Sequence, residues 1–192
     1  TLLRLAHWQH RNTRTGSRRN IHAHYDLGDA LFSLFLDPSM MYSAAVFPRA
    51  EATLEEASRH KLDLICRKLE LQPDDHLLEI GTGWGGLAIH AARHYGCRVT
   101  TTTISENQFS YAQRRVLEAG LADRITVLSQ DYRDLQGHYD KLVSVEMIEA
   151  VGHRFMDQYF RICSERLKPA GRMLLQSITI ADRYHEQAMH TV

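Results

Sequence analysis

A run of closely spaced glycines, Glu79-Ile80-Gly81-Thr82-Gly83-Trp84-Gly85-Gly86, constrains the fold of this chain more than any other segment. It follows a short apolar stretch at residues 77–80 and precedes an alanine-rich stretch that is typical of a helix. Glycine permits the backbone conformations of a tight turn and lets a ligand approach the main chain closely. A strand, a glycine turn and a helix in this order are typical of a ligand-binding α/β sheet.

Apolar and β-branched runs of strand length recur along the rest of the chain. They predict further strands at residues 98–102, 125–128, 141–145 and 173–178. The segments between these strands have helical periodicity. We predict helices that begin after Thr53 and after Ser105, one that runs through Ala88, Ala91 and Ala92, and one over residues 154–167 that a turn at Pro169-Ala170-Gly171 follows.

Two of these helices carry cap signals. Thr53 and Glu56 form a capping box, and Ser105 and Gln108 have the same spacing before Gly120 ends the second helix. The first helix has one apolar face, made of Leu54, Ala57, Leu62, Ile65 and Leu69. Strands that alternate with helices predict an α/β fold, a doubly wound, mostly parallel sheet with helices on both faces. Ligands of such sheets bind at the carboxyl ends of the strands.

Length and composition predict one soluble domain. The chain has 192 residues, 44% of them apolar and 24% charged, as in ordinary globular proteins. Its three cysteines, Cys66, Cys97 and Cys163, are too widely spaced for a disulfide framework or a metal cluster, so we expect no metal and a reducing cytoplasm. No apolar run approaches the roughly 20 residues that a membrane span needs, and no signal peptide is visible.

Positive charge gathers at the start of the chain, although the net charge is zero. Before the first acid, Asp26, stand Arg4, Arg11, Arg14, Arg18 and Arg19. We therefore expect residues 1–23 to form a basic arm. This arm either binds anionic lipid headgroups, with a binding free energy of about 1 kcal/mol per arginine, or is a solvated terminus. Nucleic acid is disfavoured as a partner, because the rest of the chain is acidic enough to cancel this charge.

The glycine run fits two ligand templates. The dinucleotide fingerprint uses Gly81, Gly83 and Gly86, and the methyltransferase form E-x-G-x-G-x-G uses Glu79, Gly81, Gly83 and Gly85. A dinucleotide site needs an acid about 20 residues further on, but the next predicted strand ends in threonines, and no acid lies between the glycine run and Glu106. The carboxylate of Glu79 can instead meet a cationic ligand. The pattern favours S-adenosylmethionine, which is a sulfonium with an amino-acid tail.

Several motifs, in order along nearly the whole chain, carry a resemblance to a known family. They are His24-Tyr25-Asp26-Leu27-Gly28, Leu34-Phe35-Leu36-Asp37-Pro38, Tyr42-Ser43, Gly81-Thr82-Gly83-Trp84-Gly85, Ile104-Ser105-Glu106-Asn107-Gln108, Asp131-Tyr132-Arg133-Asp134-Leu135 and Glu149-Ala150-Val151-Gly152-His153. With them the chain resembles the cyclopropane-fatty-acid and cyclopropane-mycolic-acid synthases. The resemblance implies a Rossmann-like S-adenosylmethionine-dependent methyltransferase domain at residues 24–192. That fold normally continues with further strands, so we expect this domain to lack its last strands.

The resemblance also implies site residues. Cofactor contacts are expected, beside those of Glu79 and Gly85, from Tyr42, Ser43, Gly81, Gly83, Thr103 and Gln108, and from Asp131 and Tyr132 beside the adenine. Gln108 is alternatively only a helix cap, and Tyr42 only a core residue. Catalytic roles are expected for Glu149, Gln176 and His24, although Glu149 is alternatively only a carboxylate that serves the N-terminus of the following helix. Glu146 is expected as a second carboxylate that faces the same crevice or caps the next helix.

In this family an acid at the place of Glu149 helps to hold a bicarbonate ion near the reacting carbon. The chain departs from the family in having Ala44 where a cysteine is usual and Gln176 where a histidine is common. Alanine keeps its backbone N–H and glutamine keeps a side-chain donor, so anion binding is still expected, although neither side chain titrates. These departures put ring closure in doubt more than methyl transfer.

The reaction that the resemblance implies is transfer of a methyl or methylene group to the double bond of an unsaturated phospholipid acyl chain. The product is a cyclopropane, a methyl branch or a methylene branch. We expect a cytoplasmic protein in peripheral contact with an anionic membrane. The sequence leaves the oligomeric state open, with a homodimer as one candidate. Two alternatives stand beside this function: methylation of a small soluble acceptor, and a relative that has lost catalysis.

Overall fold

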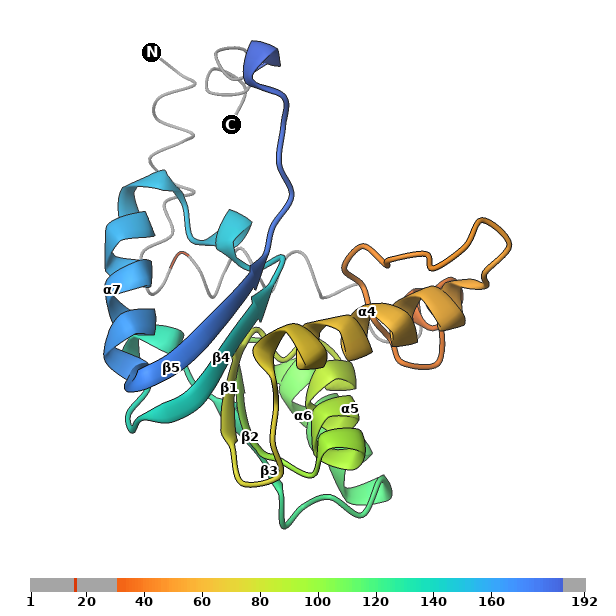
Figure 1. Ribbon diagram of the computed structural model, residues 1–192, viewed down its shortest axis with the longest axis horizontal. Coiled ribbons are helices and arrows are strands. Elements are labelled where there is room, and N and C mark those ends of the chain that lie inside the picture. The colour runs from red at the N-terminus through yellow and green to blue at the C-terminus, as the bar shows by residue number, and fades with distance from the viewer. Residues whose placement is uncertain (1–15, 17–30, 185–192) are drawn as a thin grey trace.

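The computed structural model describes Gly16 and residues 31–184 (Figure 1). The predicted basic arm lies outside the described residues apart from Gly16, and so does the candidate catalytic residue His24. The predictions made for the arginines of the arm and for His24 therefore stay predictions.

One parallel sheet forms the centre of the described structure. Its strands are β1 His76–Ile80, β2 Arg98–Thr103, β3 Ile125–Ser129, β4 Tyr139–Val145 and β5 Leu167–Gln176. They lie in the order β3-β2-β1-β4-β5, and every neighbouring pair is parallel. The order of construction reverses between β1 and β4, which is the place where doubly wound sheets bind their ligands. The predicted fold class is confirmed.

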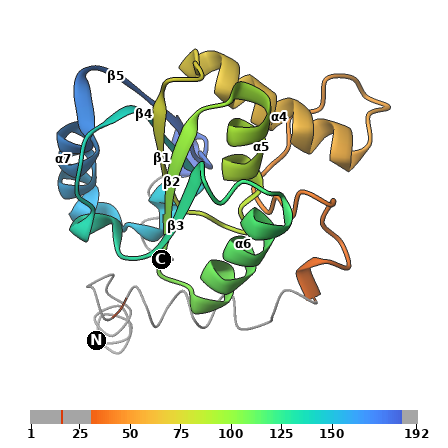
Figure 2. The ribbon, with the colours of Figure 1, turned by 90° about the horizontal axis from the view of Figure 1, so that it is seen from below.

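Helices cover both faces of this sheet. Three of them, α4 Leu54–Leu69, α5 Gly86–Tyr95 and α6 Glu106–Glu118, lie on one face, and α7 Met156–Arg166 lies on the other (Figure 2). Short 3-10 turns complete the described elements: η1 Tyr132–Asp134, η2 Ile148–Ala150, η3 His153–Phe155 and η4 Asp182–Tyr184. None of the described helices is long and apolar enough to cross a bilayer.

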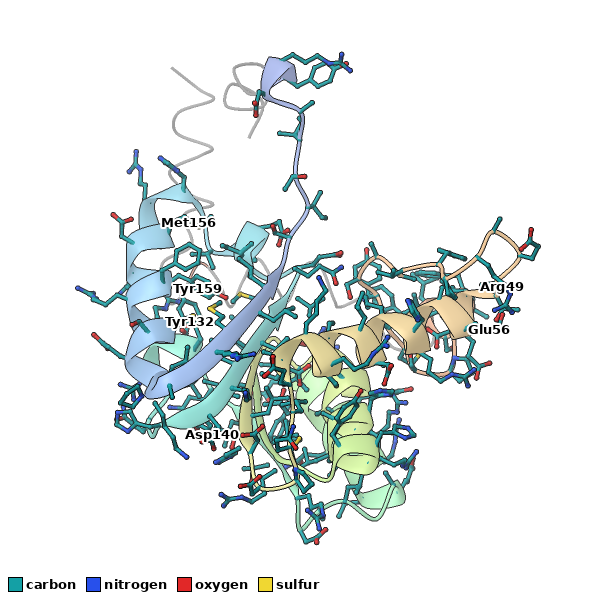
Figure 3. The ribbon with its side chains drawn as sticks, in the orientation of Figure 1. Arg49, Glu56, Tyr132, Asp140, Met156 and Tyr159 are labelled. Carbon is teal, nitrogen blue, oxygen red and sulfur yellow. The ribbon has the colours of Figure 1, made fainter. Side chains whose placement is uncertain are left out.

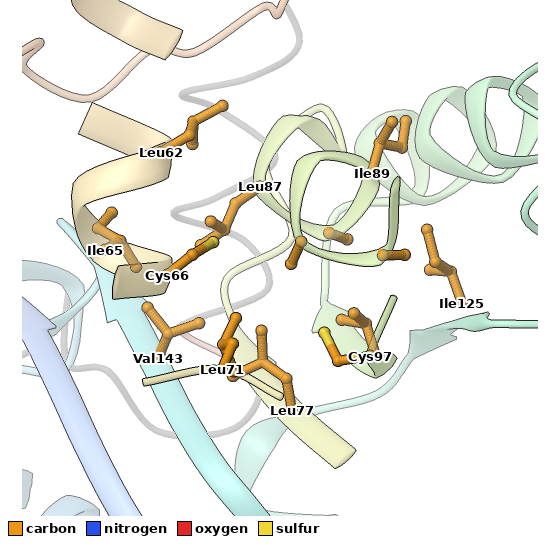
Figure 4. Packing of buried hydrophobic residues seen from close by; sticks show 14 of the residues in the cluster. Leu62, Ile65, Cys66, Leu71, Leu77, Leu87, Ile89, Cys97, Ile125 and Val143 are labelled. Carbon is orange, nitrogen blue, oxygen red and sulfur yellow. The ribbon is translucent and has the colours of Figure 1, made fainter. Parts of the chain in front are cut away.

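Alternate residues of the central strands build two separate cores. The core beneath α4 and α5 includes Leu62, Ile65, Cys66, Leu77, Leu87 and Val143 (Figure 4). The core beneath α7 includes Leu78, Leu142 and Tyr159. Successive strand residues point to opposite faces, so Leu77 and Leu78 serve different cores. Burying each such leucine contributes roughly 2 kcal/mol, and this fixes which helix covers which face.

The first predicted cap is confirmed. Thr53 Oγ1 accepts a hydrogen bond from Glu56 N at 3.2 Å, and Glu56 accepts one from Thr53 N at 2.8 Å. Arg49 holds the same glutamate at 2.6 Å (Figure 3). The prediction that Leu54 belongs to the buried face of this helix is wrong, since Leu54 is 41% exposed. The helix begins beyond the edge of the sheet (Figure 1), so its first turn has no sheet to pack against.

Of the two hydrogen bonds predicted for the second cap, only one is present. Ser105 accepts a hydrogen bond from Gln108 N at 3.3 Å, as a cap should. The side chain of Gln108, however, does not return to the cap. It accepts a hydrogen bond from Thr103 Oγ1 at 2.9 Å. The alternative interpretation of Gln108 as a helix-capping side chain is therefore wrong.

The predicted turn at Pro169-Ala170-Gly171 is a bulge inside β5. Tyr139 of β4 pairs with Leu167, whereas Lys141 pairs with Arg172, so extra residues of β5 are left out of the ladder. Proline has no N–H to donate, and a bulge is where a parallel ladder tolerates it. The strand also ends at Gln176 and not at residue 178, as we had expected.

Candidate cofactor and catalytic site

A cavity of about 580 Å³ lies at the carboxyl ends of β1, β2 and β4. The predicted site residues that line it are Tyr42, Ser43, Glu79, Gly81, Gly83, Thr103, Gln108, Asp131, Tyr132, Glu146 and Glu149. Gly85 does not line it; a Cβ there would lie 3.3 Å from Ala112 of α6, so this glycine serves helix packing. Gln176 is also outside the lining, but it reaches the cavity through Glu146.

The glycine loop turns sharply from β1 into α5. Gly81 and Gly83 have φ angles of 103° and 51°, both in the region that favours glycine. The backbone amides of Gly81 and Thr82 donate to Thr102 O at 3.1 and 3.0 Å, which fastens the loop to β2. At Gly86 a Cβ would lie 2.7 Å from Ser39 O. Glycine is therefore required there for close packing of the leading segment, residues 31–53.

One arginine that the sequence analysis missed joins this leading segment to the glycine loop. Arg115 of α6 donates through Nη1 to Ser39 O at 2.9 Å and to Trp84 O at 3.0 Å. Its Nη2 donates to Pro38 O at 3.1 Å. A planar guanidinium with several fixed donors suits three carbonyls that converge in this way. An arginine on a partly exposed helix carries no local signal of such a role.

Glu79 is a buried carboxyl group in the wall of the cavity. Its side chain is 4% exposed, and burial raises its pKa to about 8 against the opposing effect of a hydrogen bond with Thr101. Oε2 has no hydrogen-bond partner among the residues that the structure describes. An unpaired buried carboxyl oxygen is costly unless a ligand satisfies it. A ligand that brings positive charge to this wall fits that requirement.

Thr103, at the end of β2, and Gln108, in the first turn of α6, form a polar pair. Both side chains are buried, and Thr103 Oγ1 donates to Gln108 Oε1 at 2.9 Å. Thr103 Oγ1 also accepts from Ser105 N at 3.1 Å. The threonine thus fixes the orientation of the glutamine amide, because Oε1 is already engaged. The amide nitrogen keeps its donors for a ligand in the cavity.

Asp131 and Tyr132, the predicted neighbours of the adenine, both line the cavity. Both carboxylate oxygens of Asp131 are engaged by Arg133, whose Nη2 lies 2.5 Å from Oδ2 and whose Nε donates to Oδ1 at 2.8 Å. Tyr132 packs edge-on against Tyr159 with ring centroids 5.5 Å apart, beside α7 (Figure 3). Arg133, which the sequence analysis did not single out, fixes the aspartate, and Tyr159 fixes the tyrosine.

Tyr42 and Ser43 lie on a loop that a buried lysine supports. Tyr42 is 48% exposed, so the alternative that it is a core residue is wrong, although its ring contacts Phe32 at 5.1 Å between centroids. Lys61 Nζ donates to Ser43 Oγ at 2.6 Å and to Ser43 O at 3.2 Å. Desolvation lowers the pKa of Lys61 to about 8, and the charges of Glu146 and Asp37 oppose this shift.

The sequence contained a signal for Lys61 that we did not use. Lys61 follows Ala57 by four residues and therefore lies on the apolar face of α4. A lysine on a buried face needs a polar partner.

The two candidate carboxylates beyond β4 have different partners. Glu146 Oε1 accepts hydrogen bonds from Ala44 N at 3.0 Å and from Gln176 Nε2 at 2.8 Å. Glu149 is exposed and accepts a hydrogen bond from Ile178 N at 2.5 Å. Both side chains line the cavity. The predicted alternative that Glu146 caps the following helix has no support in these contacts, since its carboxylate binds the leading segment and β5.

We predict that Glu79→Gln stabilises the ligand-free protein at high pH. Burial raises the pKa of Glu79 from its ordinary 4.5 to about 8. The stability that the neutral carboxyl group contributes to the folded protein is then fully present below the ordinary pKa of 4.5. It is lost as the pH rises through the folded-state pKa of about 8. Glutamine cannot ionise. Calorimetry at about pH 5 and about pH 9 should show a melting-temperature advantage for the variant that grows with pH. An advantage equal at both pH values would contradict this assignment.

Comparisons with known proteins agree with this geometry. The family model for mycolic acid cyclopropane synthetase matches residues 12–192. Tuberculostearic acid methyltransferase UfaA1 of Mycobacterium tuberculosis is 41% identical over 187 residues, which are 94% of this chain and 44% of that protein. Cyclopropane-fatty-acyl-phospholipid synthase of Escherichia coli is 48% identical over 155 residues, 81% of this chain and 39% of that protein. The chain thus spans less than half the length of these relatives.

A solved structure is similar over most of the chain. Mycolic acid cyclopropane synthase CmaA1, complexed with SAH and CTAB, gives a TM-score of 0.83 at 37% identity over 88% of this chain and 60% of that one. Coclaurine N-methyltransferase, with a TM-score of 0.70 at 24% identity, shares the fold. The family model covers nearly the whole sequence, and the glycine loop, the unpaired Glu79 and the cavity lie where such a fold binds its ligand. The chain belongs to the mycolic acid cyclopropane synthetase family.

Proposed function

We propose that this chain is the S-adenosylmethionine-binding part of an enzyme that transfers a methyl or methylene group to the double bond of an unsaturated phospholipid acyl chain. The observation that carries the proposal is a single cavity with two kinds of wall. One wall is the glycine loop with Glu79, and the other is apolar with two carboxylates at its edge. The names of the relatives, a fatty-acyl-phospholipid synthase and a tuberculostearic acid methyltransferase, support a lipid acceptor.

The residues of the first wall fit S-adenosylmethionine. Gly83 has no atom within 4 Å of the place of a Cβ, so the backbone is open to a ligand. The unpaired oxygen of Glu79 suits the cationic end, and the amide of Gln108 suits the ribose hydroxyls. Tyr132 is the proposed neighbour of the adenine. When bound, this cofactor supplies an electrophilic methyl group on a positively charged sulfur.

The second wall suits an apolar acceptor. It is built from Met40, Met147, Val145, Val151 and Ile178. Ile178 and the nearby Ile180 are 69% and 55% exposed, so the end of β5 offers an apolar approach to the cavity. An alkene is a weak nucleophile, and its reaction needs in-line positioning with water excluded. Apolar lining beside the cofactor loop, where Met147 lies 3.4 Å from the Cβ position of Gly81, meets both needs.

The two donors expected to bind a bicarbonate ion, the Ala44 N–H and the Gln176 side-chain amide, already donate to another group in this chain. The donors that remain after the Ala44 and Gln176 replacements both bind Glu146 Oε1. A second anion would meet the Glu146 carboxylate at the same donors. The residues present therefore do not fit a bicarbonate ion between Ala44 and Gln176. Glu149 remains a proposed catalytic residue at the edge of the cavity.

We further propose that the protein works in the cytoplasm at an anionic membrane surface. The five arginines that precede Asp26 supply the charge for such contact. Exposed apolar side chains of the leading segment, Leu34, Phe35 and Phe47, add surface that lipid would cover.

The first prediction concerns cofactor binding at Gly83. We expect Gly83→Leu to remove measurable binding of S-adenosylhomocysteine in titration calorimetry, because the new side chain fills the ligand's approach. Gly120→Leu is the matched control. Gly120 also has a positive φ, 69°, and open space around its Cβ position, but it does not line the cavity. Equal binding by the two variants, with both folded by circular dichroism, would refute the assigned loop.

The second prediction concerns the reaction. When the purified protein is incubated with methyl-labelled S-adenosylmethionine and unsaturated phospholipid, mass spectrometry should find the label in the acyl chain. The mass also separates a cyclopropane from a saturated methyl branch. Label transferred only to a small soluble acceptor would replace this function with the soluble one. Cofactor affinity without any labelled product would identify a relative that has lost catalysis.

The third prediction concerns the membrane. Sedimentation with anionic vesicles should exceed that with neutral vesicles and should weaken with salt, because salt screens the arginines. Replacing the five arm arginines by glutamine should remove the difference, because each arginine contributes about 1 kcal/mol to the free energy of binding to an anionic surface. The control variant replaces exposed arginines of the domain, namely Arg67, Arg93, Arg98, Arg114 and Arg161. Equal loss in both variants would assign the effect to net charge and not to the arm.

A further inference from the structure

Glu146 is already held by the donors at the edge of the cavity. Its Oε1 accepts from the Ala44 backbone N–H at 3.0 Å and from the Gln176 side-chain amide at 2.8 Å. Among the residues that the structure describes, both of these hydrogen bonds end on the same carboxylate oxygen. Neither of these two donors engages Oε2, so the lone pairs of Oε2 are not used by them. A carboxylate with one oxygen anchored and the other available is suited to accept a proton.

The backbone of Glu146 is held in a strained conformation to achieve this. Its φ of 47° lies in the left-handed region, which residues other than glycine seldom adopt. Glu146 N donates to Gln176 O at 2.8 Å, so backbone and side chain of Gln176 both bind this residue. Strain of this kind persists only where the surroundings fix it, and it gathers at functional sites. Here it accompanies a side chain that lines the cavity.

A buried cation lies on the other side of the same loop. Lys61 Nζ binds the carbonyl and hydroxyl oxygens of Ser43, the residue before Ala44. The charge of Glu146 opposes the desolvation that lowers the Lys61 pKa, so the two groups interact. Lys61 thus fixes Ser43, the residue next to the Ala44 N–H that binds Glu146.

We infer that the carboxylate of Glu146 takes the place of the bicarbonate ion and is the base of the reaction. This inference rests on the proposed function, because it assigns the proton acceptor of lipid methylation. The anion is then part of the chain, and the enzyme needs none from solution. Gln176 and Ala44 act as positioning residues that orient Glu146.

The electrons and protons balance as follows. The alkene's π electrons form the new bond to the methyl carbon while the carbon–sulfur bond breaks, and its electron pair stays on sulfur. The second alkene carbon is left as a carbocation, which the anionic carboxylate stabilises. Glu146 then takes one proton from the transferred methyl group. The electrons of that C–H bond close the three-membered ring, or form a methylene double bond after a hydride shift. The protonated Glu146 returns its proton to solvent.

The test uses Glu146→Gly, because glycine suits the left-handed backbone and leaves both donors free. Glu70→Gly is the matched control: Glu70 has a φ of 53° and pairs with Arg172 outside the cavity. In carbonate-free buffer with S-adenosylhomocysteine present, titration with sodium bicarbonate should give binding heat for Glu146→Gly. The wild type and Glu70→Gly should give none. Bicarbonate binding to the wild type would overturn the inference.

Turnover supplies the second measurement. Glu146→Gly should lower lipid product by roughly a hundredfold or more, and bicarbonate or formate should restore part of it. Glu146→Gln keeps the side-chain volume, so it should lose activity without such rescue. Wild-type turnover should be the same with and without bicarbonate.

The outcomes separate the two proposals. Lipid product that depends on added bicarbonate in the wild type would refute the role of Glu146 and leave the proposed function standing. Absence of any lipid product, together with bicarbonate binding only to Glu146→Gly, would refute the lipid function and leave the anion site assigned.

Discussion

The position of β1 between β2 and β4 is the constraint on which the rest of the structure depends. Parallel pairing on both sides aligns the carboxyl ends of the three strands, and the reversal of strand order opens a crevice beside them. The glycine loop leaves β1 at this crevice, and Gly81 and Thr82 are fastened to Thr102 of β2. Because the loop is fixed on the β2 side, the β4 side is free to carry the carboxylates.

Ionic side chains then attach the leading segment to this frame at three points. Arg115 binds the carbonyls of Pro38 and Ser39, Lys61 binds Ser43, and Glu146 binds Ala44. Each interaction joins the leading segment to a helix or to the end of a strand. Partly buried charges with several hydrogen bonds hold geometry well, since breaking one leaves the other group unsatisfied. The wall of the cavity near Tyr42 is therefore fixed by these charged groups together with the apolar cluster of Phe32, Met40 and Trp84.

The alternation of strands and helices was predictable because it depends on local periodicity. The five strands, the capping box of Thr53 and the glycine turn were all predicted from neighbouring residues. The predictions were wrong where contacts with segments distant in the sequence decide the local structure. The segment around Pro169 is a bulge because of its register with β4, and Leu54 is exposed because α4 extends past the sheet.

For the site, the strand and turn pattern of the sequence determined that Glu79, Gly81 and Gly83 lie at the carboxyl edge of the sheet, and the resemblance to the family added residues of other segments, such as Tyr42 and Gln108. Only the tertiary structure decided how they are paired. Ala44 and Gln176 were predicted as donors for an ion, but the structure gives them to Glu146, which lies 102 and 30 residues away from them. The place of Lys61 on the apolar face of α4 indicated a need for a polar partner but did not identify Ser43, and Arg115 gave no local signal. Hydrogen bonds between distant segments leave no periodic signal, so they become visible only when the chain is folded.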